Sequence, residues 1–324
     1  MTTASTNTVI DNTSNAGFQA WVNEIYTNLV TNCGLTQTGD TGQMAVPCVT
    51  ARPATSTVGG YYILRFNDSL QGTSPIFFKL EFGQGVANGL LLYITLGTGS
   101  NGAGTINGTT MTRVAACSTS SVPSSNVTNY VSRYCYDTVT GTCWMGFKYG
   151  GNSAVAYGTC AGFIIYRSVD NTGAPTATSV HLVTNSGTTS GSASSAGVVQ
   201  ILNYVNSVAE TIQANNNFTG LVPFNSGATG AGSAASGTVT GGNGQVFPGF
   251  QWARTATSFG LGLTNAHAAC AANDISLGST TTVTILGSTS ITYMSAGNPF
   301  GGNGTFGYLF QLGASNYSML CVWQ

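Results

Sequence analysis

The sequence predicts an α+β protein, predominantly β, with antiparallel β-sandwich-like sheets and two amphipathic helices. Three observations support this fold class. Apolar residues recur with helical spacing in two segments. Short runs rich in aromatic and β-branched residues, bounded by turn-forming clusters, fill most of the remaining chain. The chain of 324 residues is also long enough to bury a real core without disulfides or a metal.

The first expected helix runs from Phe18 to Val30. Ser14 or Asn15 can cap its start, because a short polar side chain there accepts a hydrogen bond from the first helical turn. Gly34 follows its end, where a left-handed backbone conformation is favoured. The apolar stripe of this helix contains Phe18, Val22, Ile25 and Leu29.

The second expected helix runs from about Ala196 to Ala214. A Ser-rich approach and the run Asn215–Asn217 at its exit fit helix boundaries. Its predicted apolar face contains Val198, Leu202, Val205, Val208 and Ile212.

The expected strands are runs of aromatic and β-branched residues between turn-forming segments. The runs Tyr130–Tyr136 and Cys143–Tyr149 flank a turn at 137–141, which predicts a β-hairpin. The expected strands are Tyr61–Asn67, Ile76–Phe82, Leu90–Leu96, Tyr130–Tyr136, Cys143–Tyr149, Phe163–Ser168, Val180–Thr184, Thr281–Leu286, Thr289–Met294, Tyr308–Gln311 and Ser318–Trp323.

We expect two domains, each of which opens with a helix and continues as strands. The N-terminal domain covers residues 1–192 and the C-terminal domain covers residues 193–324. Within the second domain, residues 224–245 are rich in Gly, Ser and Ala. This composition predicts a flexible connector or a long loop.

Charge is the most unusual property of the chain. It has 8 Lys and Arg and 9 Asp and Glu residues among 324, which is 5%, whereas soluble domains usually carry about a quarter. Gly, Ser, Thr and Asn are left to cover the surface. These residues are less costly to desolvate in a protein interface than charged residues are. We therefore expect a subunit of a larger assembly whose partners are copies of itself and other proteins.

The composition and the short apolar runs argue against nucleic acid and membranes as partners. Eight scattered cations and a net charge of −1 do not neutralise a nucleic-acid backbone. The longest apolar stretch, Leu90–Leu96, is too short to span a bilayer. The first residues, MTTASTNTVIDNTS, contain neither the basic nor the apolar segment of a secretory signal, so we expect synthesis in the cytosol without secretion by that route.

The eight cysteines form no C-x-x-C pair, which argues against a zinc site. Buried thiols that act as small apolar groups are one interpretation, and disulfides are the other. The leading disulfide candidate joins Cys135 and Cys143 across the predicted hairpin turn. The cysteines are Cys33, Cys48, Cys117, Cys135, Cys143, Cys160, Cys270 and Cys321.

Motifs for catalysis or cofactor binding are weak. Gly97-Thr-Gly99-Ser-Asn-Gly102 matches the dinucleotide glycine pattern, but AGTINGTT follows it and does not begin the helix that a pyrophosphate needs. His267 lies three residues before Cys270. A buried histidine beside a buried thiol explains this spacing better than a catalytic pair does.

The carboxylates also have structural explanations. Glu81 lies beside Lys79 in a predicted strand, and Asp68, Asp137 and Asp170 lie in predicted turns. A glycosidase needs two facing carboxylates, which this pattern does not supply. We therefore assign no catalytic, cofactor-binding or metal-binding residue, and we expect no enzyme activity.

Several segments resemble a module of virion structural proteins from tailed bacteriophages. The resemblance begins with GYYILRFNDSLQGTSPIFFKLEFG and LLYITLGTGSNGAGTINGTT. It continues with FIIYRSVDNTGAPTATSVHLV, GQVFPGFQWART, GSTTTVTILGSTSITYMSAG and a short apolar end, SMLCVWQ. It covers most of the chain, implies a component of the virus particle and supplies no site residues.

Charge and resemblance together predict a non-enzymatic virion structural protein, made in the host cytoplasm, that works by packing. A tail-associated position (collar, baseplate or fibre attachment) is preferred to capsid decoration. The alternative is a receptor-binding adhesin that recognises host surface glycan. Its candidate sugar-stacking residues, which a structural interpretation places in the core, are Trp144, Tyr149, Trp252 and Tyr293.

Overall fold

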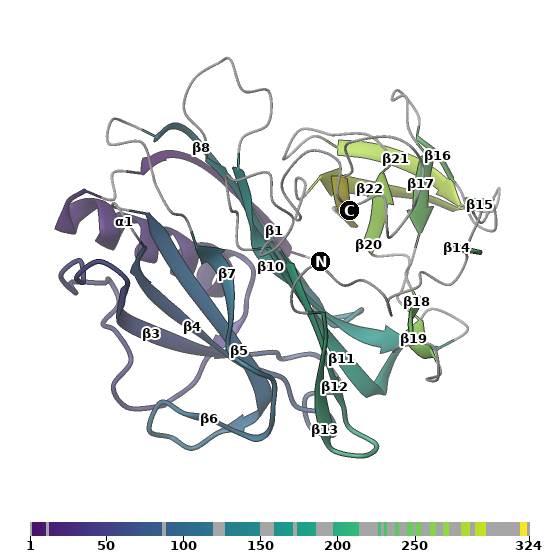
Figure 1. Ribbon diagram of the computed structural model, residues 1–324, viewed down its shortest axis with the longest axis horizontal. Coiled ribbons are helices and arrows are strands. Elements are labelled where there is room, and N and C mark those ends of the chain that lie inside the picture. The colour runs from purple at the N-terminus through teal and green to yellow at the C-terminus, as the bar shows by residue number, and fades with distance from the viewer. Residues whose placement is uncertain are drawn as a thin grey trace.

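The computed structural model describes part of the chain, as several continuous ranges and a set of separate short strands (Figure 1). The continuous ranges are residues 2–10, 13–85, 89–118, 127–149, 159–170, 174–185 and 197–213. Beyond them, ten strands between residues 226 and 322 are described. The described residues form antiparallel sheets and one α-helix, which confirms the predominantly β class.

The first expected helix is confirmed. α1 spans Asn15–Tyr26 and continues as a π-helical segment, η1, at Thr27–Asn32. The Ser14 side chain caps α1 by accepting a hydrogen bond from the Gly17 amide at 3.0 Å. Gly34 follows with φ at +87°, a conformation that strains other residues. The buried stripe consists of Phe18, Val22, Ile25 and Leu29.

A six-stranded sheet follows, in the order β2-β3-β4-β5-β6, with β7 paired to β5. Three expected strands are confirmed as its centre, β3–β5, whereas the short strands β2, β6 and β7 were not expected. The bounds are β2 Thr36–Gln37, β3 Thr57–Arg65, β4 Phe77–Gln84, β5 Leu90–Ser100, β6 Ile106–Thr110 and β7 Val114–Ser118.

A nine-stranded sheet has the order β1-β8-β9-β10-β11-β12-β13, with β19 paired to β10 and to β18. The expected hairpin β8–β9 and the expected strands β10 and β11 are confirmed. The bounds are β1 Thr2–Ile10, β8 Val127–Asp137, β9 Thr142–Tyr149, β10 Thr159–Val169, β11 Pro175–Asn185, β12 Gly197–Asn203, β13 Val208–Gln213, β18 Gln251–Ala253 and β19 Gly260–Leu263.

The prediction of a second helix is wrong, because residues 197–213 form the β12–β13 hairpin. Asn203 and Asn206 turn the chain: each side chain accepts a hydrogen bond from the amide two residues ahead, at 2.8 and 3.2 Å. β-branched residues, which lose side-chain freedom in a helix, are frequent in both strands. Leu202 is completely buried and Val205 is 78% exposed, so the predicted single apolar face does not exist.

The predicted domain boundary at 192/193 falls between β11 and β12, which pair with each other in the nine-stranded sheet. The Gly-, Ser- and Ala-rich segment 224–245 contains three short strands, β14–β16, and the start of β17. The division of the chain into two domains stays a prediction.

Six strands near the C-terminal end close into a barrel in the order β16-β17-β20-β23-β22-β21. Three of the later expected strands correspond to β21, β22 and β23, and Tyr308–Gln311 lies outside the described residues. The bounds are β14 Ser226–Gly227, β15 Gly230–Ala231, β16 Gly237–Val239, β17 Gln245–Pro248, β20 Ala268–Ala271, β21 Thr280–Ile285, β22 Thr289–Ser295 and β23 Ser318–Val322.

One hydrophobic core joins α1 to both of the larger sheets. The rings of Phe78 in β4 and Phe163 in β10 meet at 6.0 Å between centroids, across the two sheets. Trp21 of α1 meets Phe82 of β4 edge-on at 5.6 Å. The helix and the two sheets therefore bury their apolar sides against one another.

Candidate functional site

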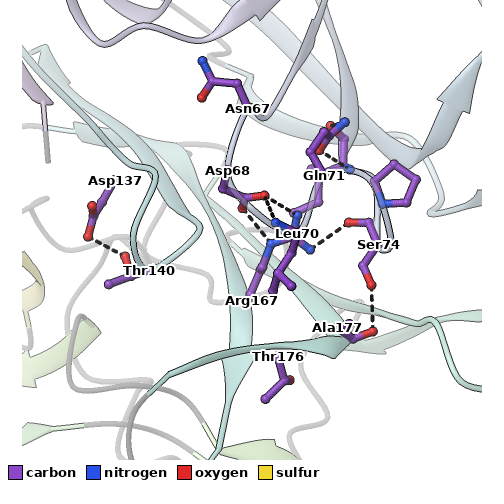
Figure 2. A network of polar contacts seen from close by, with 12 residues as sticks. Asn67, Asp68, Leu70, Gln71, Ser74, Asp137, Thr140, Arg167, Thr176 and Ala177 are labelled. Atoms are coloured by element: carbon purple, nitrogen blue, oxygen red, sulfur yellow. Dashed lines mark hydrogen bonds and ion pairs between the residues drawn. The ribbon is translucent and has the colours of Figure 1, made fainter.

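Arg167 in β10 is the most deeply buried charged side chain that the structure describes. A charge in such a place needs a partner, because burial without one is very unfavourable. Asp68 supplies it: Nε of Arg167 donates to Oδ2 at 2.7 Å, and Nη2 donates to Oδ1 at 2.9 Å (Figure 2). The third nitrogen, Nη1, donates to the backbone carbonyl of Ser74 at 2.8 Å. We call these three residues the inter-sheet clamp.

The loop between β3 and β4 presents two members of the clamp to the nine-stranded sheet. Asp68 and Ser74 both lie in this loop. The Ser74 hydroxyl donates to the Ala177 carbonyl of β11 at 2.9 Å (Figure 2). The Tyr204 hydroxyl donates to the Pro75 carbonyl at 2.7 Å. The loop is therefore tied to the opposite sheet at several points along its length.

The turn between β8 and β9 closes against the clamp. The Gly141 carbonyl accepts a hydrogen bond from the Arg167 amide at 3.1 Å. Gly141 has φ at +61°, and a Cβ atom there would lie 2.7 Å from Arg167 Cδ and 2.8 Å from Asp68 Oδ2. Asp137 holds the same turn by accepting a hydrogen bond from the Thr140 hydroxyl at 2.7 Å (Figure 2). The positive φ and the lack of room for a Cβ atom thus both require glycine at position 141.

The clamp is closed to chemistry with other molecules. The side chains of Arg167 and Asp68 are 0% and 3% exposed. Every nitrogen of the guanidinium and both oxygens of the carboxylate have partners within the protein. A bidentate pair of this kind fixes distance and orientation. The arrangement can hold two sheets in one relative position, and its burial keeps both charged groups from contact with a substrate.

A second buried carboxylate joins α1 to the nine-stranded sheet. Glu24 Oε1 accepts hydrogen bonds from the Ser132 hydroxyl and, at 3.0 Å, from the Tyr134 hydroxyl, both on β8. The other oxygen, Oε2, is buried and has no hydrogen-bond partner in the part of the chain that the structure describes. Burial raises the pKa of Glu24 to about 7, although both hydrogen bonds act to lower it. This carboxyl group therefore titrates near neutral pH.

Asp40 organises loops beside the six-stranded sheet. Its carboxylate accepts hydrogen bonds from the Thr38 hydroxyl at 2.5 Å, the Ser100 hydroxyl at 2.7 Å and the Gly104 amide at 3.1 Å. Burial alone would raise the pKa of Asp40, but these hydrogen bonds outweigh burial and lower it. A carboxylate that is satisfied in this way stabilises loops and is a poor general base.

One face of the six-stranded sheet carries a group of partly exposed side chains, which we call the outer-face cluster: Tyr61, Lys79, Glu81, Tyr93 and Arg113. Glu81 pairs with Arg113 Nε at 2.6 Å and with Lys79 Nζ at 3.9 Å, so the predicted neighbourhood of Glu81 and Lys79 is confirmed. Lys79 Nζ lies 4.1 Å from the centre of the Tyr61 ring, and Arg113 Cζ lies 3.7 Å from that of Tyr93. This surface presents two tyrosine rings and two cationic side chains, and Glu81 is the single carboxylate of the cluster.

His181 in β11 is completely buried. Its ring stacks on Tyr166 with centroids 4.9 Å apart, and its Nε2 lies 3.3 Å from the Ser179 hydroxyl oxygen. Burial lowers the pKa of His181 to about 3, so the ring is neutral. Nδ1 has no hydrogen-bond partner among the described residues, so within this part of the chain the Ser–His contact lacks the orienting carboxylate of a triad. The sequence also places His267 three residues before Cys270, but His267 and the Cys270 side chain lie outside the described residues.

The leading disulfide candidate is wrong, because Cys135 and Cys143 are buried thiols that are not joined to each other. In the hairpin register Cys135 lies opposite Trp144, and Cys143 lies opposite Tyr136. Successive residues of a strand point to opposite faces, so the two thiols lie on opposite faces of the sheet. Burial raises the pKa of both thiols, which keeps them protonated and unreactive. The buried-thiol interpretation is confirmed for Cys33, Cys48, Cys117, Cys135 and Cys143.

The glycine pattern adopts the geometry of a hairpin. Gly97 and Gly99 lie in β5, and the chain turns at Gly102 into β6. The segment after the third glycine is thus the strand β6, which was not expected, and the prediction that no dinucleotide-binding helix begins there is confirmed. Asp170 accepts a hydrogen bond from the Ala174 amide at 3.0 Å, which confirms its role in a turn.

Trp144, one of the four candidate sugar-stacking residues, is completely buried in β9, as the structural interpretation expected. It cannot stack on a ligand at the surface. The side chains of Tyr149, Trp252 and Tyr293 lie outside the described residues.

Among the described side chains, no group of three or more His, Cys, Asp or Glu is placed to hold a metal ion. No helix in this part of the chain is both long and apolar enough to cross a membrane. The chain matches no protein-family model, no curated protein and no solved structure.

Proposed function

We propose that this chain is a non-enzymatic virion structural protein of a bacteriophage, a subunit that packs against copies of itself and other virion proteins. The observation that carries this proposal is the nearly uncharged surface. Among the charged side chains that the structure describes, only Arg113 and Asp170 are largely exposed, and the others are partly or fully buried. Dispersed monomers normally depend on surface charge for solubility. A surface of Gly, Ser, Thr and Asn is instead suited to burial against protein.

The placement of four other charged residues supports the same role. Arg167, Asp68, Asp40 and Asp137 are buried, and each has hydrogen-bond partners inside the protein. They stabilise loops and hold the two sheets together, which suits a rigid building unit better than an enzyme. Two of the segments that resemble virion proteins contribute the two sides of the clamp, Asp68 in one and Arg167 in the other.

The position in the particle is testable by labelling. Gold-conjugated antibodies raised against the purified chain should label the tails of intact particles at the collar, the baseplate or the fibre attachment. Labelling of the head would instead favour capsid decoration. Particles without any label, or normal particles from a phage that lacks the gene, would contradict a structural role in the virion.

A receptor-binding adhesin for host surface glycan is the second candidate, and the outer-face cluster is the observation that favours it. Partly exposed Tyr61 and Tyr93 lie beside Arg113 and Glu81 on one sheet face. Aromatic rings with adjacent hydrogen-bonding groups are suited to sugar rings. Binding of the purified chain to a glycan array, abolished by Tyr93→Ala, would support this role. Retention of binding in Tyr93→Ala would exclude this face.

A further inference from the structure

β1 forms one edge of the nine-stranded sheet. It pairs antiparallel with β8 from Thr2 opposite Tyr136 to Ile10 opposite Val127 (Figure 1). It has no other strand partner among the described residues. In an antiparallel pair, a strand directs alternate amides and carbonyls toward its neighbour. The other side of β1 therefore presents a row of backbone groups that can bind one further strand.

The helical segments lie over a face of this sheet, and no other described strand lies along the edge that β1 forms. α1 and η1 both contact β1, and η1 also contacts β8. Glu24 of α1 hydrogen-bonds to Ser132 and Tyr134 of β8. An element that contacts two neighbouring strands lies across their face. Ala4 of β1 packs against the hydrophobic core on this face.

β1 lacks most of the features that usually protect an edge. Edge strands of monomeric proteins are commonly short or carry Lys, Pro or bulges. β1 has 9 residues, TTASTNTVI, without charge and without Pro. Its register with β8 is regular from Thr2 to Thr8 and shifts only between Thr8 and Ile10. This regular part is long enough for strand addition.

We propose that β1 is a self-association edge, at which β1 of a second copy adds in antiparallel orientation and joins two sheets into one. A two-fold axis at Ser5 would place Thr2 opposite Thr8 and Thr3 opposite Asn7. Such an interface is self-complementary, because each strand supplies the same donors and acceptors. Small, uncharged side chains meet without repulsion, and Thr pairs across strands are favourable. The inference rests on the proposed function, because it names the surface through which the packing subunit associates.

Amide hydrogen exchange of the full chain tests the proposal without any substitution. In a monomer, β8 protects alternate amides of residues 2–8 and the remaining amides exchange rapidly. In the proposed dimer, the remaining amides become protected as the protein concentration rises, in step with a doubling of mass in sedimentation. Rapid exchange of these remaining amides at every protein concentration would overturn the inference.

A charge-swap experiment gives an independent test. Ser5→Lys places like charges opposite each other at the two-fold axis, and Ser5→Glu does the same. Each variant alone should dimerise about five- to tenfold more weakly at low salt. An equimolar mixture should recover dimerisation as a heterodimer. Thr138→Lys, at an exposed position in the β8–β9 turn, is the matched control and should dimerise like the wild type. Circular dichroism establishes that every variant is folded.

The outcomes separate this inference from the proposed function. If the chain dimerises but the Ser5 variants do not weaken the dimer, another surface is responsible and the inference fails. If the β1 amides become protected only when another virion protein is added, self-pairing is wrong although the packing role stands. If concentration-dependent protection is found but antibodies do not label particles, the edge pairing stands and the virion role fails.

Discussion

Arg167 and Asp68 lie 99 residues apart and form a bidentate ion pair between β10 and the loop that joins β3 to β4. Removing two charges from water is costly, so such a pair contributes little net stability compared with apolar residues of the same shape. Removing one partner of the pair is strongly destabilising, because the other charge is then left buried alone. The pair therefore acts mainly on the relative position of the two sheets.

A double-mutant cycle tests this interpretation. In the wild-type protein the Leu70 amide donates to Asp68 Oδ1 at 3.2 Å. Asp68→Asn keeps an oxygen that can accept this hydrogen bond, but it removes the negative charge that pairs with Arg167. Arg167→Met leaves Asp68 unpaired. We expect each single variant to lower the free energy of unfolding by about 3–5 kcal/mol, and the double variant to lose much less than the sum. Urea denaturation measures all four proteins, and additive losses would show that the pair is not coupled.

Only one side of this pair could be predicted from the sequence. Turn formers in FNDSLQGTSP place Asp68 in a loop, because a short carboxylate accepts hydrogen bonds from nearby amides. Its partner could not be predicted, since the contact depends on how two sheets face each other. The available signal is Arg167 itself, a charge within the apolar run FIIYRS of a charge-poor chain. Glu24 gives a similar signal, three residues after buried Trp21 on a helix.

The helix α1 was predictable because its cap, its apolar stripe and its C-terminal glycine agree with one another. Residues 197–213 carry apolar residues that fit a helical and a strand period alike, and the turn at Asn203 and Asn206 decides between them. The strand β1 has no apolar alternation to identify it. It becomes a strand through its pairing with β8, which is 100 or more residues distant in the chain.

Gly141 and Gly34 should respond differently to the same substitution. Both have positive φ, so alanine costs about 1 kcal/mol at either position from backbone strain alone. At Gly34 a Cβ atom would meet no described atom within 4 Å, whereas at Gly141 it would meet Arg167 and Asp68 below 3 Å. Gly141→Ala should therefore lower the thermal midpoint clearly more than Gly34→Ala. Equal midpoints would mean that the turn does not press against the clamp.

Glu24 should make the protein less stable as pH rises. Its pKa is raised from 4.5 to about 7 in the folded protein. Between these values the folded state holds a proton that the unfolded chain has released, so the free energy of unfolding falls with rising pH, by about 3 kcal/mol in all. Glu24→Gln keeps an oxygen that can accept from Ser132 and Tyr134 but cannot ionise. This variant should be more stable than the wild type at pH 8, and denaturation from pH 4 to pH 8 should show a smaller slope.

Leu202 and Val205 distinguish the hairpin from the helix that the spacing predicted. A helix would place both on one apolar face, whereas the structure buries Leu202 completely and leaves Val205 78% exposed in the β12–β13 turn. Leu202→Ala should lower the free energy of unfolding by about 2–5 kcal/mol, because it leaves a cavity in the shared core. Val205→Ala should change it by less than about 0.5 kcal/mol. Denaturation of the two variants in parallel provides the measurement. Comparable losses at both positions would support the helix and contradict the hairpin.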